Sequence, residues 1–148
     1  MKKIIIITTA IVLQFITFCA IAQTNGKLAP LTFTVNGFAD NSGQLLVYMY
    51  RKDDKIPSDP FKLLEAEIKG KQAFVQIEDL LPGEYACIFV HDQNANNHID
   101  HSFGIPNEPL GYTNNWKLTL FSGMPTFEKL RFTYSYTKCN YVIDMDEE

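Results

Sequence analysis

The residues of this chain that are best suited to catalysis or metal binding lie between His91 and Asn115. This stretch reads HDQNANNHIDHSFGIPNEPLGYTNN and contains all three histidines of the sequence. Its first half places Asp or Asn at alternate positions, a spacing that can direct several oxygen atoms toward one point. Three interpretations follow: a metal-binding loop, a catalytic cluster, or a polar loop between β-strands.

The first interpretation is a calcium loop that begins at Asp92. Ca²⁺ prefers six to eight oxygen ligands at about 2.3–2.6 Å, and a tightly curled loop presents alternate side chains to one centre. Counted from Asp92, oxygen side chains occupy positions one, three, five and nine, and a backbone carbonyl is available at position seven. The predicted ligands are Asp92, Asn94, Asn96, the backbone carbonyl of His98, and Asp100.

Two positions depart from the usual calcium-loop pattern. Position six is normally Gly because the backbone needs a positive φ there, and Asn97 is the residue that tolerates this conformation next best. Position twelve is normally Glu, but here it is Phe103, and Glu108 is a candidate substitute. We therefore expect weak binding, with a dissociation constant on the order of 10⁻⁴–10⁻³ M. The competing interpretation is a set of turn residues that hydrogen-bond their own backbone.

The second interpretation is a transition-metal site built from His91, His98 and His101. Imidazole nitrogens bind Zn²⁺ and Cu²⁺, and the three histidines fall close together in the chain. His91 ends an apolar, strand-like run, where a structural histidine is the more common occurrence. A metal carrier or a metal-dependent enzyme is thus the alternative to the calcium loop.

Covalent catalysis finds little support elsewhere in the chain. The sequence has no Gly-x-Ser-x-Gly motif and no glycine-rich phosphate loop. Cys87 lies among apolar residues, which raises the pKa of a thiol and suppresses its reactivity. We expect a non-catalytic protein and predict no catalytic residue. A disulfide between Cys87 and Cys139 and a pair of free thiols both remain open.

The beginning of the chain predicts export. Two lysines and an apolar run from residue 4 to residue 21 precede Ala20-Ile21-Ala22, whose small residues suit signal peptidase. We predict a signal peptide at residues 1–22 and a mature domain at residues 23–148, located in the periplasm or outside the cell. A retained membrane anchor and lipidation at Cys19 are the alternatives.

The charge of the chain restricts its partners. The formal net charge is −4, removal of the leader would take away two lysines, and the tail at residues 144–148 is acidic. A negative chain without a basic stripe argues against nucleic acid and anionic lipid as partners. We expect a monomer with no membrane span after cleavage and an unidentified partner in the envelope or outside the cell. A protein-interaction module using a strand edge or Trp116 is a third possible function.

The elements that must position the polar stretch are short β-strands. Alternating or continuous apolar runs divided by turn residues predict strands at residues 31–35, 44–51, 73–77, 84–90, 127–134 and 140–145. Residues 116–121 are a weaker strand prediction, and residues 61–68 fit either a helix or a strand, with a strand favoured at their end. We expect the first two strands to pair as a hairpin. The pattern indicates an all-β fold: a single antiparallel β-sandwich, immunoglobulin- or transthyretin-like, with about seven strands and one long ordered loop.

The strand that leads into the polar stretch has the clearest pattern. Pro82 and Gly83 form a turn, after which the hydroxyl of Tyr85 is able to reach back to the backbone of the corner. Apolar residues then occupy both faces of residues 84–90, so we expect this strand to be central. Tyr85, Cys87 and Phe89 should share one face, and Ala86, Ile88 and Val90 the other.

The mature chain resembles the family named domain of unknown function 2141, a group of small exported bacterial proteins. The resemblance rests on QLLVYMYR, DLLPGEYACIFVHD, the Asp/Asn loop, the segment FGIPNEPLGYTNN and Met124-Pro125-Thr126-Phe127-Glu128. Members of this family usually carry Asp-x-Asn-Gly-Asn-Gly in the loop, and Ala95 and Asn97 replace those glycines here. The resemblance implies a β-fold and export, but it implies no catalytic residue.

Overall fold

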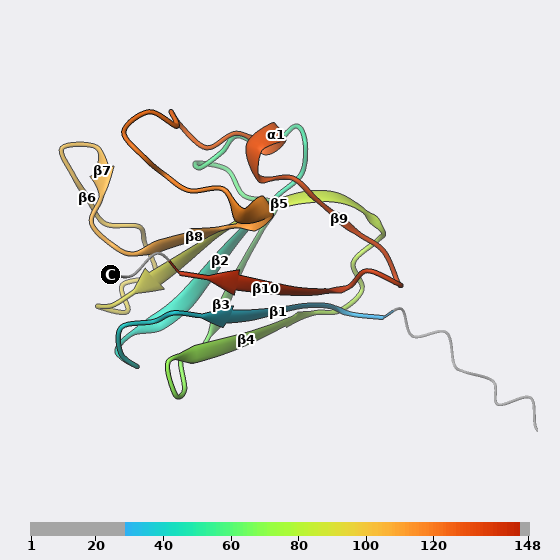
Figure 1. The fold of residues 1–148 in the computed structure, drawn as a ribbon, viewed down its shortest axis with the longest axis horizontal. Coiled ribbons are helices and arrows are strands. Elements are labelled where there is room, and N and C mark those ends of the chain that lie inside the picture. Colours follow the sequence, from blue (N-terminus) through green and yellow to red (C-terminus); the bar gives the residue numbers. More distant parts are fainter. Residues whose placement is uncertain (1–28, 146–148) are drawn as a thin grey trace, which may run out of the picture.

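The computed structural model describes residues 29–145, which form two packed β-sheets with short connecting elements (Figure 1). The smaller sheet has the strand order β10-β1-β4. Its strands are β1 (Leu31–Asn36), β4 (Gln72–Ile77) and β10 (Asn140–Asp144). β1 is antiparallel to β4 and parallel to β10, so one parallel pair occurs in an otherwise antiparallel fold.

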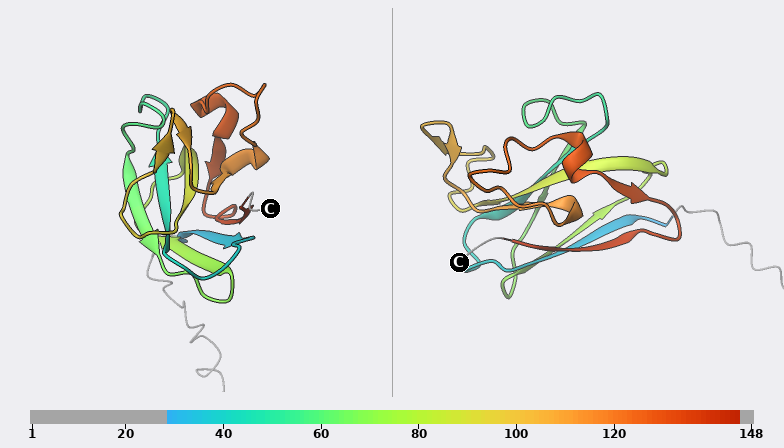
Figure 2. Two further views of the ribbon diagram at one scale, coloured as in Figure 1. Left: turned by 90° about the vertical axis from the view of Figure 1, so that its left-hand side faces the viewer. Right: turned by 45° about the horizontal axis from the view of Figure 1, so that its top comes forward.

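The larger sheet has the strand order β3-β2-β5-β8, and β9 pairs with the first part of β5. Its strands are β2 (Gln44–Tyr50), β3 (Lys62–Ala66), β5 (Gly83–Asp92), β8 (Leu110–Tyr112) and β9 (Phe132–Tyr134). The remaining elements are the two-residue strands β6 (His101–Ser102) and β7 (Ile105–Pro106), the 3₁₀-helix η2 (Thr113–Asn115) and the helix α1 (Phe127–Leu130). The β6–β7 hairpin projects from one end of the molecule (Figures 1 and 2).

Two apolar clusters lie on opposite faces of the larger sheet. The first fills the space between the two sheets and includes Phe33, Val47 and Phe89. The second lies on the outer face and includes Ile88 and Leu130, under the loops and short helices that cover this face (Figure 2). Because the larger sheet is covered on both faces, its inner strands are apolar throughout rather than alternating.

The structure confirms the all-β sandwich and the predicted role of the strand after Pro82. β5 has β2 on one side and β8 and β9 on the other. Its residues divide between the clusters as the alternation predicts: Tyr85, Cys87 and Phe89 face the inner cluster, and Ala86, Ile88 and Val90 face the outer one. The hydroxyl of Tyr85 donates a hydrogen bond to the carbonyl oxygen of Leu81 at 2.8 Å, which closes the corner.

Three strand predictions are corrected. Residues 31–35 and 44–51 do not form a hairpin, because β1 and β2 belong to different sheets. Residues 116–121 are irregular and contain a turn, although their apolar residues suggested a strand. The predicted strand at 127–134 begins instead as α1, because Phe127 and Leu130 are three residues apart and both turn into the outer cluster. The strand preference within residues 61–68 is confirmed by β3.

Several predictions concern residues at the edges of the described part. The predicted signal peptide, Cys19 and the last residues of the acidic tail lie outside residues 29–145. Within residues 29–145, no helix has the length and apolar character of a membrane span. Cys87 and Cys139 are both free thiols, and burial raises the pKa of Cys87 well above its usual value.

The corner hydrogen bond predicts the effect of Tyr85→Phe. The substitution keeps the ring and removes the hydroxyl that satisfies Leu81, so unfolding free energy should fall by about 1 kcal/mol. Tyr136→Phe is the matched control, because Tyr136 is exposed and its ring contact with Tyr134 is retained. Urea denaturation measures both. Equal midpoints for Tyr85→Phe and the unmodified protein would show that the corner bond contributes nothing.

Candidate functional site

The polar loop begins where β5 ends, at the fully buried carboxylate of Asp92. Its Oδ1 accepts the backbone N–H of Asn96 at 3.0 Å, and its Oδ2 accepts the backbone N–H of Asn97 at 2.8 Å. The side chain of Gln44, directly opposite on β2, donates to the same Oδ2 at 2.9 Å and to Asn97 Oδ1 at 2.7 Å. Asp92 therefore folds the loop back over the end of the strand from which it emerges.

A close backbone approach keeps this corner tight. Gly43, just before β2, has a φ of +62°, and a Cβ atom there would lie 1.9 Å from the carbonyl oxygen of Asp92. A side chain at residue 43 would push β2 and the start of the loop apart. The residue before Gln44 therefore has to be glycine for Gln44 and Asp92 to remain paired.

Asp100 is the second carboxylate of the loop, and two predicted ligands converge on it. The amide of Asn94 donates to Asp100 Oδ2 at 2.7 Å, and the amide of Asn96 lies 3.1 Å from both Asp100 oxygens. Because Asn96 also donates its backbone N–H to Asp92, it connects the two carboxylates. The four predicted side-chain ligands therefore belong to one hydrogen-bonded cluster.

Glu108 joins this cluster from beyond the β6–β7 hairpin. Its Oε2 accepts the backbone N–H of Asp100 at 3.1 Å, so its carboxylate lies against the loop. The side chain is only 8% exposed, and its Oε1 is buried without a hydrogen-bond partner in the described part of the chain. A buried carboxylate oxygen without a donor costs free energy, and a cation is the kind of partner that would remove this cost.

The two buried carboxylates have opposite pKa shifts. Burial tends to raise the pKa of Asp92, but the hydrogen bonds from Gln44, Asn97 and Asn96 together outweigh it, so the pKa is lowered. Burial raises the pKa of Glu108, and the nearby charges of Asp92 and Asp100 raise it further. Backbone hydrogen bonds from Asp100 and, to a smaller extent, Gln93 lower the pKa and offset this rise only in part. The charged form of Glu108 is therefore less stable here than it would be in water.

The backbone of the loop adopts the conformation for which the pattern usually requires glycine. Ala95 has a φ of 54° and Asn97 a φ of 65°, both in the left-handed region. Asn tolerates this region, whereas Ala pays a steric penalty of about 1–2 kcal/mol there. Glycine at position 95 would therefore fit the observed backbone better than alanine does.

The three histidines do not assemble into a metal triad. His91 is buried against Phe38, and its Nε2 lies 2.8 Å from the carbonyl oxygen of Ser42, so it has a structural hydrogen bond. His98 and His101 are exposed. Within residues 29–145, no three His, Cys, Asp or Glu side chains are grouped so that they could hold a metal ion. In this conformation the carboxylates of Asp92, Asp100 and Glu108 are therefore not grouped around one metal position. The predicted calcium ligands also include the amide oxygens of Asn94 and Asn96 and the backbone carbonyl of His98.

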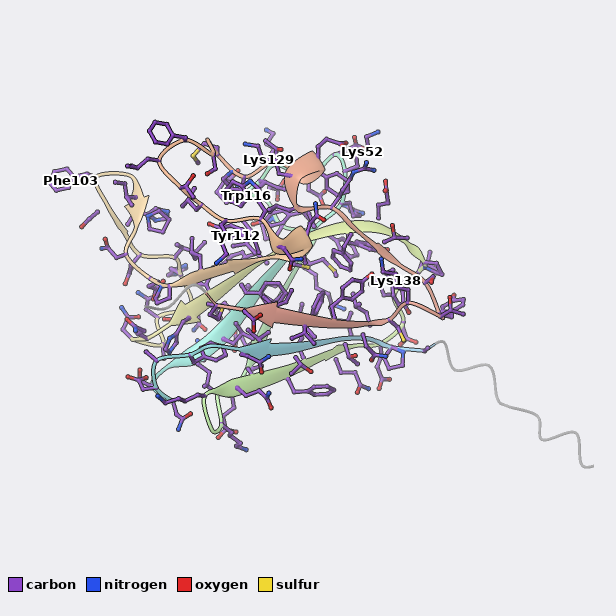
Figure 3. The ribbon with its side chains drawn as sticks, in the orientation of Figure 1. Lys52, Phe103, Tyr112, Trp116, Lys129 and Lys138 are labelled. Carbon is purple, nitrogen blue, oxygen red and sulfur yellow. The ribbon has the colours of Figure 1, made fainter. Side chains whose placement is uncertain are left out.

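Phe103 and Trp116, which the sequence analysis also singled out, lie away from the hydrogen-bonded cluster of the loop. Phe103, at position twelve of the calcium pattern, lies fully exposed at the tip of the β6–β7 hairpin (Figure 3). Trp116 packs edge-on against Tyr112, with ring centroids 4.7 Å apart, and the Nζ of Lys129 lies 5.5 Å from its ring (Figure 3). The tryptophan is therefore part of the outer layer rather than a free interaction surface.

Sequence reasoning did not identify Gln44 as a residue that supports the loop. Gln44 holds Asp92 across the sheet, and only the pairing register of β2 with β5 reveals this contact. Glu108 was a candidate by residue type, and the structure brings it to the back of the loop.

The fold and the loop together define a small all-β sandwich protein with a cluster of Asp, Asn and Glu at one end of its central strand. The family model for domain of unknown function 2141, described as an uncharacterised protein conserved in bacteria, matches residues 33–140. The chain belongs to this family, as its sequence predicted. Comparison with curated proteins and comparison with solved structures each gave no match.

The positive φ of Ala95 predicts that Ala95→Gly stabilises the loop. Glycine relieves the steric penalty, so the unfolding free energy should rise by about 1 kcal/mol. Asn97→Gly is the matched comparison: it should give no gain, because Asn already tolerates this backbone and its Oδ1 accepts a hydrogen bond from Gln44. Thermal unfolding of the three proteins is the measurement. A loss of stability in Ala95→Gly would contradict the proposed strain.

The raised pKa of Glu108 predicts a pH-dependent effect of Glu108→Gln. A carboxyl group with a raised folded-state pKa contributes stability below its unfolded pKa and loses that contribution as pH rises through the folded pKa. Without divalent cations, Glu108→Gln should therefore be more stable than the unmodified protein near pH 7. The difference should shrink toward about pH 4. Glu65→Gln, at an exposed position of β3, should show no such trend. A variant uniformly less stable at every pH would rule out this account of Glu108.

Proposed function

We propose that this protein is an exported, non-catalytic binding module whose loop at residues 92–108 binds one calcium ion. The ligands would be side-chain oxygens of Asp92, Asn94, Asn96, Asp100 and Glu108, with the backbone carbonyl of His98. These are six oxygen donors, the lower end of the range that Ca²⁺ takes in proteins. The observation that carries the proposal is the buried, unpartnered Oε1 of Glu108 behind a loop that already gathers the other oxygens.

The hydrogen bonds within the loop are compatible with a small rearrangement on cation binding. Asn94 Oδ1 accepts the N–H of Asn96, and Asn96 Oδ1 accepts the N–H of His98. A carboxamide oxygen has two acceptor positions, so each retains one for a cation. The amide groups that now donate to Asp100 would then rotate, and the carboxylates of Asp92, Asp100 and Glu108 would move closer together around the ion. Binding would also relieve the repulsion among Asp92, Asp100 and Glu108.

Glu108 would replace the ligand that the loop lacks at position twelve. Phe103 occupies that position and points into solvent, so it provides no oxygen from its side chain. Glu108 follows the β6–β7 hairpin, whose base is closed by a hydrogen bond from the Asn107 N–H to the Asp100 carbonyl at 2.8 Å. The hairpin therefore lies between Asp100 and Glu108 in the chain and brings the Glu108 carboxylate back to the loop.

The location and class of the protein are part of the same proposal. The predicted leader at residues 1–22 supports export to the periplasm or beyond, where calcium reaches millimolar concentrations that suit weak extracellular sites.

The free thiol of Cys87 is buried and has a raised pKa, so it offers no reactive group for catalysis. The histidines do not favour a transition-metal site over the calcium loop, because His91 lies 2.8 Å from the Ser42 carbonyl and His98 and His101 are exposed.

Calcium titration followed by thermal and chemical unfolding tests the proposal. For a dissociation constant on the order of 10⁻⁴–10⁻³ M, about 10 mM Ca²⁺ should raise the unfolding free energy by about 1.4–2.7 kcal/mol. Glu108→Gln and Asp100→Asn should each lose most of this gain, whereas Glu65→Gln should keep it. Because Glu108→Gln is expected to fold well without calcium, its loss of response would report on ligation rather than on folding.

Two results would contradict the proposal. One is an unmodified protein whose stability does not change with millimolar Ca²⁺. The other is a calcium response of equal size in Glu108→Gln and Asp100→Asn, which would place the ion elsewhere on the acidic surface.

A further inference from the structure

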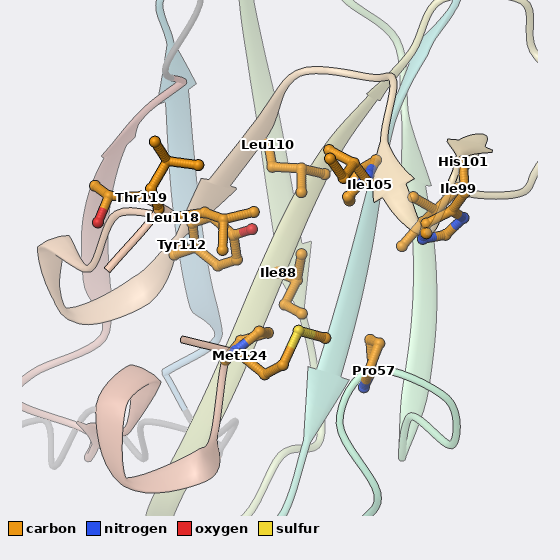
Figure 4. A pocket seen from close by; sticks show the side chains of 14 residues that line it. Pro57, Ile88, Ile99, His101, Ile105, Leu110, Tyr112, Leu118, Thr119 and Met124 are labelled. Carbon is orange, nitrogen blue, oxygen red and sulfur yellow. The ribbon is translucent and has the colours of Figure 1, made fainter. Parts of the chain in front are cut away.

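An apolar cavity of about 530 Å³ lies on the outer face of the larger sheet. Its floor is Ile88 of β5, and Leu110 and Tyr112 of β8 form one side (Figure 4). The β6–β7 hairpin and Ile99, two residues before it, form the end, and the loop before α1 closes the side opposite the hairpin with Met124. Its volume falls within the range of small-molecule sites, about 300–1,000 Å³.

Hydrogen bonds hold both movable walls in place. The hairpin is fixed by the pairing of His101 with Pro106 and of Ser102 with Ile105. The loop before α1 is fixed by Lys129, whose Nζ donates to the carbonyl oxygens of Ser122 at 2.7 Å and Met124 at 2.8 Å. The cavity is therefore preformed, as small-molecule sites usually are.

The chemistry of the walls selects an aliphatic occupant. The lining is mainly Ile, Leu, Met and Pro, and Thr119 and His101 are among its few polar side chains. A peptide segment would bring one N–H and one C=O per residue, and these walls would leave most of them without partners. Tyr112 is the only Phe, Tyr or Trp among the described lining residues, so the walls provide little stacking surface for a flat ring system.

The charged residues around the cavity restrict the polar group that a bound aliphatic molecule can carry. No Lys or Arg occurs among the described lining residues. Glu108 borders a smaller adjoining cavity of about 180 Å³, which shares Pro106, Leu110, Tyr112 and Leu118 with the larger one. An anionic head group at this end would meet the Glu108 carboxylate, with no Lys or Arg among the described residues that line either cavity. An uncharged head group suits this end of the cavity.

We propose that the cavity binds the aliphatic chain of a single amphiphile with an uncharged head group. Its exposed rim supports an elongated occupant that extends into solvent, since Ile105 and Met124 are each 66% exposed and Leu120 is 97% exposed. The proposal does not depend on calcium, because the floor and sides of the cavity are formed by β5, β8 and the loop before α1.

Calorimetric titration with n-octyl and n-decyl glucoside, below the concentrations at which they form micelles, tests the proposal. We expect saturable binding of one molecule per chain, in the presence and absence of Ca²⁺. Each buried methylene contributes about 0.8 kcal/mol, so decyl glucoside should bind about fifteenfold more tightly than octyl glucoside. Decyl sulfate, with the same chain and an anionic head, should bind more weakly than decyl glucoside. Methyl NMR shifts should localise to Ile88, Ile99 and Leu110.

Two variants keep the test specific to the cavity. Leu110→Trp fills it, and Met124→Glu places a charge on its exposed rim without altering the core. Each should weaken decyl glucoside binding by about tenfold or more. Val142→Trp, on the 64% exposed outer face of β10, adds the same bulk elsewhere and should bind like the unmodified protein.

Three outcomes would overturn the proposal. The first is no saturable binding below micelle formation. The second is association with phospholipid vesicles alone, with no methyl shifts at Ile88, Ile99 and Leu110 and with shifts confined to the aromatic-ring signals of Phe103 and Phe121, both exposed, which would indicate a membrane contact instead. The third is a self-association that covers the cavity and persists in decyl glucoside, which would identify a second copy of this chain as the occupant.

Discussion

The burial of β5 on both faces is the constraint on which the rest of the structure depends. One face completes the core between the sheets, and the other supports the outer layer of α1, η2 and the long loops. Complete burial of a large apolar side chain contributes about 1.5–3 kcal/mol, and this strand places such side chains on both faces. The polar loop and the cavity therefore both rest on a strand that has little freedom to move.

The polar loop is held in place at the end of β5. Asp92 is fully buried, and its carboxylate is stabilised by two backbone N–H groups of the loop and by Gln44 of β2. A buried charge persists only when donors of this kind compensate for lost water. The same hydrogen bonds set the curvature that brings Asn94 and Asn96 to Asp100. Glu108 lies at the back of this arrangement with fewer donors than its position requires, which makes it the least satisfied group of the cluster.

Residues 99–110 contribute to both candidate sites. Asp100 and Glu108 belong to the polar loop, whereas Ile99, Ile105 and Leu110 line the apolar cavity. A short hairpin achieves this because its turns direct neighbouring side chains to different sides. The segment is thus structurally shared by the polar loop and one end of the cavity.

Local patterns in the sequence were enough to predict the all-β class, the faces of β5 and the Tyr85 corner, because strand alternation and turn chemistry depend on neighbouring residues. The alternation of Asp and Asn likewise identified a loop whose side chains converge. Strand partners were not predictable in this way: an apolar alternation at residues 31–35 fits any sheet, and β1 pairs with β4 and β10 rather than with β2. The same holds for Gln44 opposite Asp92, for Glu108 behind Asp100 and for the apolar cavity. Each of these joins residues far apart in the chain, and such contacts are decided only when the two sheets and the outer layer pack together.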